Sequence, residues 1–258
     1  MCRLSLISGL NAELARKLLV AFKEASRRDE YLREISERGS SSHDDGWGYA
    51  LIGEAGDLSV SSYYRSCKPV FEDGEFSKLG AALRSFKSFH LIVHSRKASK
   101  GKRELRNTHP FHYAHLGFDY WFAHNGTVND AEISSNMGWK YDESLSDSHY
   151  LGRFFYECLD RDFDEISFSE TFKRAQNYVK ENSALNTVSI FSGRGVLKSI
   201  ATCFYESRSE AYEKYYKLYL HEGSGLKAVV SSTLLLYLKG NEFEFNEMEN
   251  GSYVIFEL

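Results

Sequence analysis

The chain has 258 residues, enough to bury a sizeable core without disulfide staples or a structural metal. Its 42% hydrophobic and 26% charged residues are typical of a globular protein, and a net charge of −4 gives no basic excess of the kind that binds nucleic acid. No stretch reaches the ~18 apolar residues of a membrane-spanning helix, and no signal segment precedes Cys2. We therefore expect a cytoplasmic protein that binds neither nucleic acid nor a membrane.

The predicted elements begin with a strand over 3–9, where apolar and polar residues alternate, and a helix that Asn11 caps. Further strands are expected at 48–53, 58–66, 89–95, 120–126, 186–192, 197–205, 215–221, 226–232 and 251–257. Further helices are expected at 76–86, 146–159 and 167–181. No repeat or linker divides the chain, so we expect a single domain over 1–258 of the α+β class, rich in antiparallel strands.

The basic segment 97–106 joins the predicted strand 89–95 to a turn of sequence NTHPF. Its lysines and arginines favour a surface position, where the segment is either a permanently solvated loop or a mobile lid. The residue pattern does not choose between these two interpretations.

The cysteines are widely scattered and form no CxxC pair, and the nine histidines show no HExxH spacing. These patterns argue against a zinc site and against a disulfide framework. We expect no metal, no cofactor and free thiols, as in a reducing compartment.

Cys2 directly follows the initiator methionine, so removal of Met1 would expose a residue that carries a thiol and a free amine. The thiolate is the attacking form of cysteine, and a free thiol has a pKa near ~8.5. An α-amine with a pKa of ~7.7–8.0 could accept the thiol proton directly or through one water. The alternative is a small buried hydrophobic residue near the terminus, which position alone favours.

Three more predicted segment ends carry residues suited to acyl transfer. Asn125 and Gly126 could donate an amide N–H and a backbone N–H to one oxyanion, or could form the turn of a hairpin. Arg96 could bind a carboxylate through two parallel hydrogen bonds, or could be a solvated loop residue. Asp147 could bind an ammonium group, or could cap the helix that follows.

Six segments occur in one order along the first 150 residues: MCRL, HDDGWGYA, HSRKASKG, NTHPF, FAHNGTV and SDSHY. Together they resemble the class II glutamine amidotransferase domain, a member of the N-terminal nucleophile hydrolases. The closer likeness is to the small stand-alone proteins of the type 4 group. The likeness weakens toward residue 258, and 206–225 fit the family least well.

The resemblance implies a four-layer αββα sandwich of two antiparallel sheets between helices. It implies that Cys2 attacks the side-chain amide of glutamine and forms a γ-glutamyl thioester, with release of ammonia. It also implies that Asn125 and Gly126 form the oxyanion hole, that Arg96 binds the substrate carboxylate and that Asp147 binds the substrate α-amine.

Some alternatives stay open at this point. Another γ-glutamyl amide would suit the same residues, because Arg96 and Asp147 recognise only the glutamyl end. A catalytically silent binding or regulatory module with the same fold is also compatible. The ammonia acceptor would be a separate synthase, or the protein would be a simple amidohydrolase. A further departure lies at 231–234, where SSTL replaces the Ser-Glu-Pro-Leu run of many relatives and puts a polar contact of that glutamate in doubt.

Overall fold

Two antiparallel sheets form the centre of the computed structural model, which describes residues 2–37, 39–98 and 101–258. The first sheet has the order β12-β10-β11-β1-β4-β2-β3. Its strands are β1 (Cys2–Gly9), β2 (Trp47–Ala55), β3 (Leu58–Ser66), β4 (Ser88–Arg96), β10 (Leu218–Gly223), β11 (Leu226–Ser231) and β12 (Asn246–Glu247).

The second sheet has the order β13-β8-β7-β6-β5, and the short β9 pairs with β7. Its strands are β5 (Phe111–Tyr113), β6 (Asp119–Gly126), β7 (Ser183–Gly193), β8 (Val196–Cys203), β9 (Tyr205–Glu206) and β13 (Ser252–Phe256).

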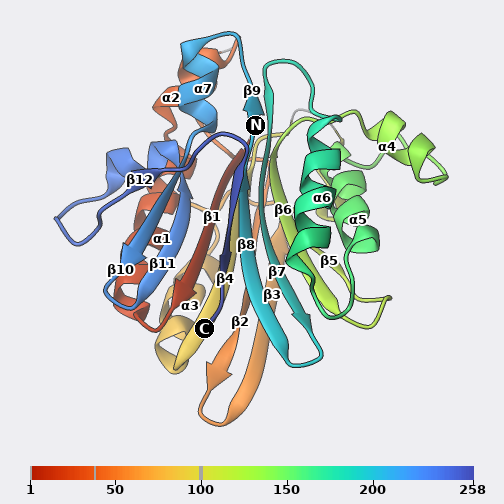
Figure 1. Ribbon diagram of the computed structural model, residues 1–258. Coiled ribbons are helices and arrows are strands. Elements are labelled where there is room, and N and C mark those ends of the chain that lie inside the picture. The colour runs from red at the N-terminus through yellow and green to blue at the C-terminus, as the bar shows by residue number, and fades with distance from the viewer. Residues whose placement is uncertain (1, 38, 99–100) are drawn as a thin grey trace.

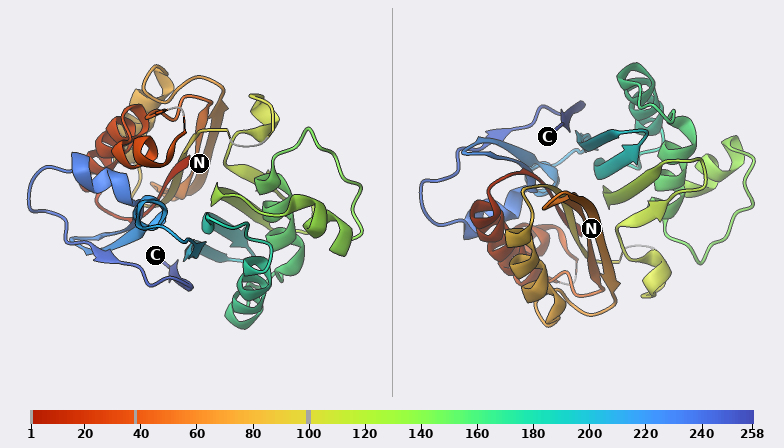
Figure 2. Two further views of the ribbon diagram at one scale, coloured as in Figure 1. Left: turned by 90° about the horizontal axis from the view of Figure 1, so that it is seen from above. Right: turned by 90° about the horizontal axis from the view of Figure 1, so that it is seen from below.

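Helices cover the outer face of each sheet (Figures 1 and 2). The α-helices are α1 (Ala12–Arg27), α2 (Glu30–Ile35), α3 (Glu75–Ala82), α4 (Asp130–Asn136), α5 (Asp147–Cys158), α6 (Glu165–Gln176) and α7 (Glu210–Tyr216). Three 3₁₀ turns are η1 (Leu83–Ser85), η2 (Leu105–Asn107) and η3 (Ser232–Tyr237). Helices α1 and α3 pack on the first sheet, and α5 and α6 pack on the second.

Alternation along the strands produces three separate core layers. In β1, Leu4 and Leu6 point between the two sheets, whereas Ile7 points toward α1. Successive side chains of a strand face opposite sides of its sheet, so a central strand must be apolar on both faces. The result is the expected four-layer αββα sandwich, and the predicted fold class is confirmed (Figure 1).

Most predicted elements are present, with shifted ends. Asn11 caps α1 through a hydrogen bond from the backbone N–H of Leu14, as predicted. The strand expected at 215–221 is partly wrong, because α7 extends to Tyr216 and β10 begins at Leu218. The helix predicted over 167–181 spans Glu165–Gln176.

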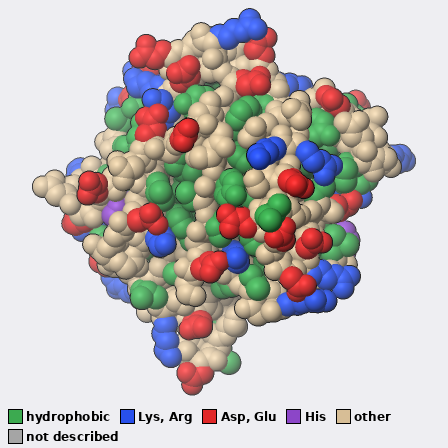
Figure 3. Space-filling view, in the orientation of Figure 1, with side chains coloured by type: hydrophobic (Ala, Val, Ile, Leu, Met, Phe, Trp, Pro, Cys, Tyr) green, Lys and Arg blue, Asp and Glu red, His purple; other side chains and the backbone are tan. Residues whose placement is uncertain are grey.

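The described helices include none that is long and apolar enough to cross a membrane. On the face shown in Figure 3, acidic and basic side chains are interspersed over the surface of both halves of the molecule.

Candidate active site

The ends of three strands bring three predicted site residues to one end of the layer between the sheets. Cys2 lies opposite Arg96 in the pairing of β1 with β4. Alternate residues of a strand face the same side of its sheet, and Leu4, Ala123 and Ile92 lie in the core layer between the sheets. Cys2 therefore faces that layer from β1, Asn125 faces it from β6 and Arg96 faces it from β4.

Cys2 is buried, with 6% of its surface exposed. Its backbone N–H donates to Oδ1 of Asn125 at 2.8 Å, and its carbonyl accepts a hydrogen bond from the Tyr215 hydroxyl at 3.1 Å. Its Sγ lies 3.9 Å from the carbonyl oxygen of Lys97. The backbone of Cys2 is therefore held on both sides by residues that lie more than a hundred positions away in sequence.

Asn125 has one half of its amide engaged and the other half available. Oδ1 accepts from Cys2, so Nδ2 must lie on the other side of the amide group. Nδ2 is buried, and no acceptor for it exists among the described residues. A buried donor without a partner is costly and marks a place where a ligand atom can bind.

Gly126 ends β6 with a φ of +155°, and a Cβ at this position would lie 1.7 Å from the carbonyl oxygen of Ala184. Only glycine fits this close approach. The hairpin interpretation of the Asn-Gly pair is wrong, because the chain continues from β6 through a bridge at Val128 into α4.

Arg96 and Asp147 are both buried near Cys2. The Arg96 guanidinium donates to the carbonyl oxygens of Lys102 and Gly101 at 3.3 and 3.4 Å. Asp147 is the first residue of α5 and accepts from the backbone N–H of Val128 at 3.0 Å. Its interpretation as the helix cap is wrong, because Ser146 occupies that position. Arg96 is likewise no solvated loop residue, since it is 2% exposed.

A cavity of about 20 Å³ connects these groups, and its walls include Cys2, Arg96, Gly126 and Asp147. That space is about the size of one water molecule. The glutamyl group that the resemblance implies as ligand is larger than this space. A much larger hollow, about 930 Å³, lies at the opposite end of the sheets, between the β2–β3 and β7–β8 turns.

The segment 97–106 forms part of the wall through Lys97 and Ala98. Lys97 pairs with Asp44, and the backbone N–H of Ala98 donates to Asp45. Residues 99 and 100 of the predicted lid lie outside the described part of the chain, so the choice between lid and solvated loop stays a prediction.

Comparison with known proteins finds similar sequences in one family. The model of the class II glutamine amidotransferases matches residues 30–142, a range that includes Arg96, Asn125 and Gly126 but neither Cys2 nor Asp147. A Haemophilus influenzae protein described as "Putative glutamine amidotransferase" is 21% identical over 234 residues, which cover 83% of this chain and 74% of that protein. The YafJ protein of Escherichia coli, with the same description, is 30% identical over 92 residues, or 35% of this chain and 33% of that protein.

The predicted resemblance to the class II glutamine amidotransferases is confirmed.

A solved structure shares this fold. Glutamine phosphoribosylpyrophosphate amidotransferase from B. subtilis, solved with ADP and GMP, matches 98% of this chain with a TM-score of 0.58 and 13% identity. The chain spans 47% of that longer protein, so the likeness extends to the fold of about half of it.

Within this fold, buried histidines lie at the cavity. The rings of His94 and His109 lie 4.1 Å apart, and His109 and His124 reach the cavity wall. Burial lowers the pKa of His94 to about 3 and that of His124 to about 4, and it lowers the pKa of His109 well below its ordinary value. These rings are neutral at pH 7, and no cluster in the described part of the chain has the three or more ligand side chains that a metal ion needs.

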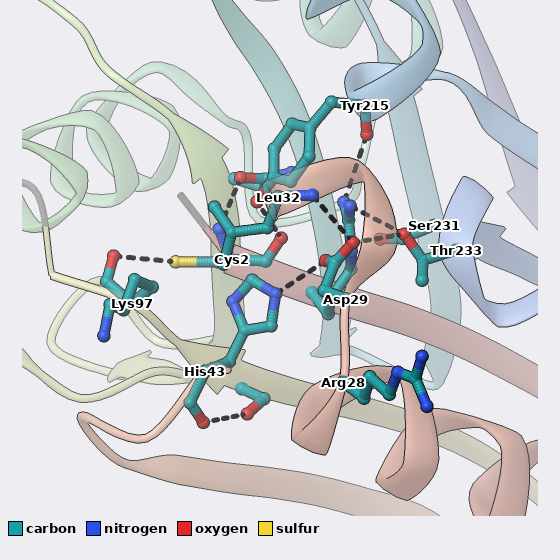
Figure 4. A network of polar contacts seen from close by, with 12 residues as sticks. Cys2, Arg28, Asp29, Leu32, His43, Lys97, Tyr215, Ser231 and Thr233 are labelled. Atoms are coloured by element: carbon teal, nitrogen blue, oxygen red, sulfur yellow. Dashed lines mark hydrogen bonds and ion pairs between the residues drawn. The ribbon is translucent and has the colours of Figure 1, made fainter. Parts of the chain in front are cut away.

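The sequence interpretation missed a buried polar cluster behind Cys2, drawn in Figure 4. We call it the Asp29 cluster; its members are Arg3, Asp29, His43, Tyr215 and Thr233. The one sequence feature that indicates this cluster is Arg3, a charged residue within a strand predicted to be buried.

The SSTL run provides polar contacts of its own in place of the family's glutamate. Ser231 hydrogen-bonds both the N–H and the carbonyl of Leu4, and Thr233 donates to Asp29 and accepts from Arg3.

Proposed function

We propose that the protein is a glutamine amidohydrolase or amidotransferase that uses Cys2 as an N-terminal nucleophile. The observation that carries the proposal is the convergence of Cys2, Arg96, Gly126 and Asp147 on one cavity, with Asn125 hydrogen-bonded to Cys2 beside it. These are the groups that acyl transfer from a glutamyl amide requires: a nucleophile, an oxyanion donor, a cation for the carboxylate and an anion for the amine.

The reaction proceeds in two steps. The Cys2 thiolate attacks the amide carbon, and the oxyanion that forms accepts hydrogen bonds from Asn125 Nδ2 and the Gly126 N–H. The C–N bond breaks, ammonia leaves with the proton from the thiol, and a γ-glutamyl thioester remains. Water then hydrolyses the thioester to glutamate and restores the thiol. The α-amine of Cys2, exposed when Met1 is removed, is one group able to carry the proton.

Arg96 and Asp147 bind the α-carboxylate and α-amine of the substrate, and these groups occur in every γ-glutamyl amide. Glutamine is therefore the first candidate substrate, and another γ-glutamyl amide is the second. The released ammonia passes to a separate synthase or to solvent. We treat residues 1–258 as one amidotransferase domain, because strands from both ends of this range belong to the same two sheets.

An electrophilic glutamine analogue tests the proposal. It should label Cys2 and spare Cys67, Cys158 and Cys203, as read by peptide mapping, and Cys2→Ala should abolish both labelling and ammonia release. Intact mass should show loss of Met1 in the labelled protein. A label on any of the other three cysteines would overturn the assignment of the nucleophile.

A panel of γ-glutamyl amides, assayed for released ammonia or amine, then identifies the substrate. A folded protein whose Cys2 is never labelled and which releases nothing from any member of the panel would instead support a silent binding module.

A further inference from the structure

The first residues of β1 have a neighbouring strand on one edge only. Pairing of β1 with β4 extends to Cys2, which lies opposite Arg96. Pairing with β11, on the other edge, starts at Ser5, which lies opposite Val230. Buried backbone N–H and C=O groups need hydrogen-bond partners, so the start of β1 requires groups other than a strand on that edge.

Side chains provide these partners. Ser231 Oγ accepts from the N–H of Leu4 and donates to its carbonyl, both at 3.1 Å. At Cys2, the N–H donates to Asn125 Oδ1 at 2.8 Å, and the carbonyl accepts from the Tyr215 hydroxyl at 3.1 Å. The backbone of the predicted nucleophile is therefore held by two side chains from distant parts of the chain.

Tyr215 is itself fixed in direction. It is 0% exposed, its carbonyl accepts from Arg3 Nη1 at 3.1 Å, and the Arg3 guanidinium lies 3.8 Å from the centre of its ring. Burial raises the pKa of Tyr215 well above its ordinary value, so the hydroxyl keeps its proton and can donate. Figure 4 shows the Tyr215 ring directed toward the backbone of Cys2.

The rest of the Asp29 cluster holds Arg3 in turn. Arg3 follows Cys2 in β1 and points to the opposite face of the sheet. Its Nε donates to Asp29 Oδ2 at 2.5 Å and its Nη2 donates to Thr233 Oγ1 at 2.8 Å. The described residues that line the cavity beside Cys2 include no member of the cluster. The cluster therefore reaches the nucleophile through the Tyr215 hydroxyl and the backbone of β1.

Such a support matters most when Cys2 is the first residue of the chain. Terminal residues are poorly ordered unless other groups tie them down. Removal of Met1 would turn the N–H of Cys2 into an α-amine and leave no preceding residue to restrain it. A nucleophile must also stay within reach of the reacting carbon, because small displacements cost a large part of the rate.

We propose that Tyr215 is a positioning residue for the nucleophile: its hydroxyl holds the Cys2 carbonyl so that the thiol faces the cavity and the amine stays at Asn125. This inference rests on the proposed role of Cys2 and adds a residue to it. Tyr215 gives and takes no proton in the reaction. It lies within 206–225, the segment that fits the family least well, so the resemblance did not indicate it.

Tyr215→Phe tests the proposal, because it removes the hydroxyl and keeps the ring that packs on Arg3. With Met1 removal verified by intact mass, kcat for glutamine should fall about three- to tenfold, the effect of one lost hydrogen bond. KM should not change, because Arg96 and Asp147 are untouched. A purely structural tyrosine would lower the urea midpoint and leave kcat of the folded protein unchanged. Equal kcat in the variant and the unmodified protein would overturn the proposal.

A pair of thiol reagents separates position from reactivity. Labelling of Cys2 by the electrophilic glutamine analogue should slow by the same factor as kcat. Alkylation of Cys2 by iodoacetamide, which needs no bound substrate, should not slow. If both reagents slowed equally, the hydroxyl would act on the reactivity of the thiol and not on its position, and the proposal would be wrong.

Tyr120→Phe is the matched control. Tyr120 is also 0% exposed, but it packs in the core between the second sheet and its helices. This variant should leave kcat and both labelling rates unchanged. If it lowered kcat as much as Tyr215→Phe does, loss of any buried hydroxyl would explain the result, and the specific role of Tyr215 would be refuted.

Hydrogen exchange decides the inference independently of activity. If the unmodified protein reacts with neither glutamine nor its analogue, the proposed function fails, but the anchor can still be measured. Exchange at the Arg3 and Leu4 amides should be faster in Tyr215→Phe than in the unmodified protein and in Tyr120→Phe, and equal exchange would contradict the anchor. Should Tyr215→Phe not fold, NMR of the unmodified protein should show a slowly exchanging Tyr215 hydroxyl proton close to Cys2, and a rapidly exchanging one would refute it.

Discussion

At the scale of single residues, Asn125 combines two tasks in one amide group. Its oxygen holds the backbone nitrogen of Cys2, and its nitrogen is left for the developing oxyanion. The two tasks can be separated by substitution, because an aspartate keeps an acceptor oxygen but has no amide donor.

We therefore predict that Asn125→Asp and Asn125→Ala both lower kcat, by about 10²–10³ for loss of one oxyanion donor. Steady-state ammonia release measures this effect. Only Asn125→Ala should also loosen Cys2, seen as faster hydrogen exchange at the start of β1. A kcat near that of the unmodified protein in either variant would remove Asn125 from the oxyanion hole.

Arg96→Ala provides the contrast, because a carboxylate clamp acts on the substrate both before and during reaction. It should mainly raise KM, whereas loss of a donor used only in the transition state lowers kcat. A fall in kcat alone in Arg96→Ala, together with a rise in KM alone in Asn125→Ala, would mean that the two roles are reversed.

At the scale of elements, the Asp29 cluster joins β1 to α2, α7 and η3 through buried polar groups. Removing one partner of a buried ion pair leaves an uncompensated charge, so Asp29→Ala should lower the free energy of unfolding by about 3–5 kcal/mol. Urea unfolding at pH 7 measures this loss. Glu13→Ala is the control, since the exposed pair Glu13–Arg16 should contribute less than about 1 kcal/mol.

The contribution of Asp29 also depends on pH. Its pKa is depressed in the folded state, so its stabilisation is complete above the ordinary carboxyl pKa of ~3.9 and is lost as the pH falls below that value. The difference in stability between the unmodified protein and Asp29→Ala should therefore be constant from pH 5 to 7. A difference that shrank over that range would show that Asp29 is not ionised in the cluster.

The elements that the sequence did not predict are short ones. Helices α2 and α7 have six and seven residues, too few for apolar periodicity to separate them from loops. Long strands and α1 were predictable because alternation and capping act within a local window. The Asp29 cluster was not, because Arg3, Asp29 and Thr233 meet only through tertiary packing.

The candidate site residues, by contrast, could be selected from sequence because each lies at the end of an apolar run or at the start of a helix. The distances between these residues along the sequence do not show that they meet in space. The resemblance to the family provided that expectation. Their geometry is now described, while their chemical roles remain proposals.

At the scale of the whole molecule, buried neutral histidines make stability sensitive to acid. Burial lowers the pKa of His90 and His124 to about 4 and that of His94 to about 3, while an unfolded histidine has a pKa near ~6.5. Between these values the unfolded chain binds protons that the folded chain does not. Stability therefore rises with pH in this range and is lost as the pH falls below ~6.5.

Each such histidine contributes a slope of about 1.4 kcal/mol per pH unit between pH ~6 and ~4.5. We predict that urea unfolding at several pH values gives a slope larger than one histidine can supply. His90→Asn should reduce this slope by the contribution of one histidine, about 1.4 kcal/mol per pH unit. An unchanged slope in that variant would show that His90 is already charged in the folded protein.

The position of Arg3 next to Cys2 has a consequence for strand alignment. If β1 slipped by one residue along its neighbours, every side chain would change faces: the thiol would enter the helix-side layer, and the guanidinium would enter the space between the sheets. Asp29 would then be a buried anion without its cation. The buried ion pair therefore favours the native register of β1 over a register shifted by one residue. In the native register the thiol stays on the face that the proposed substrate can reach.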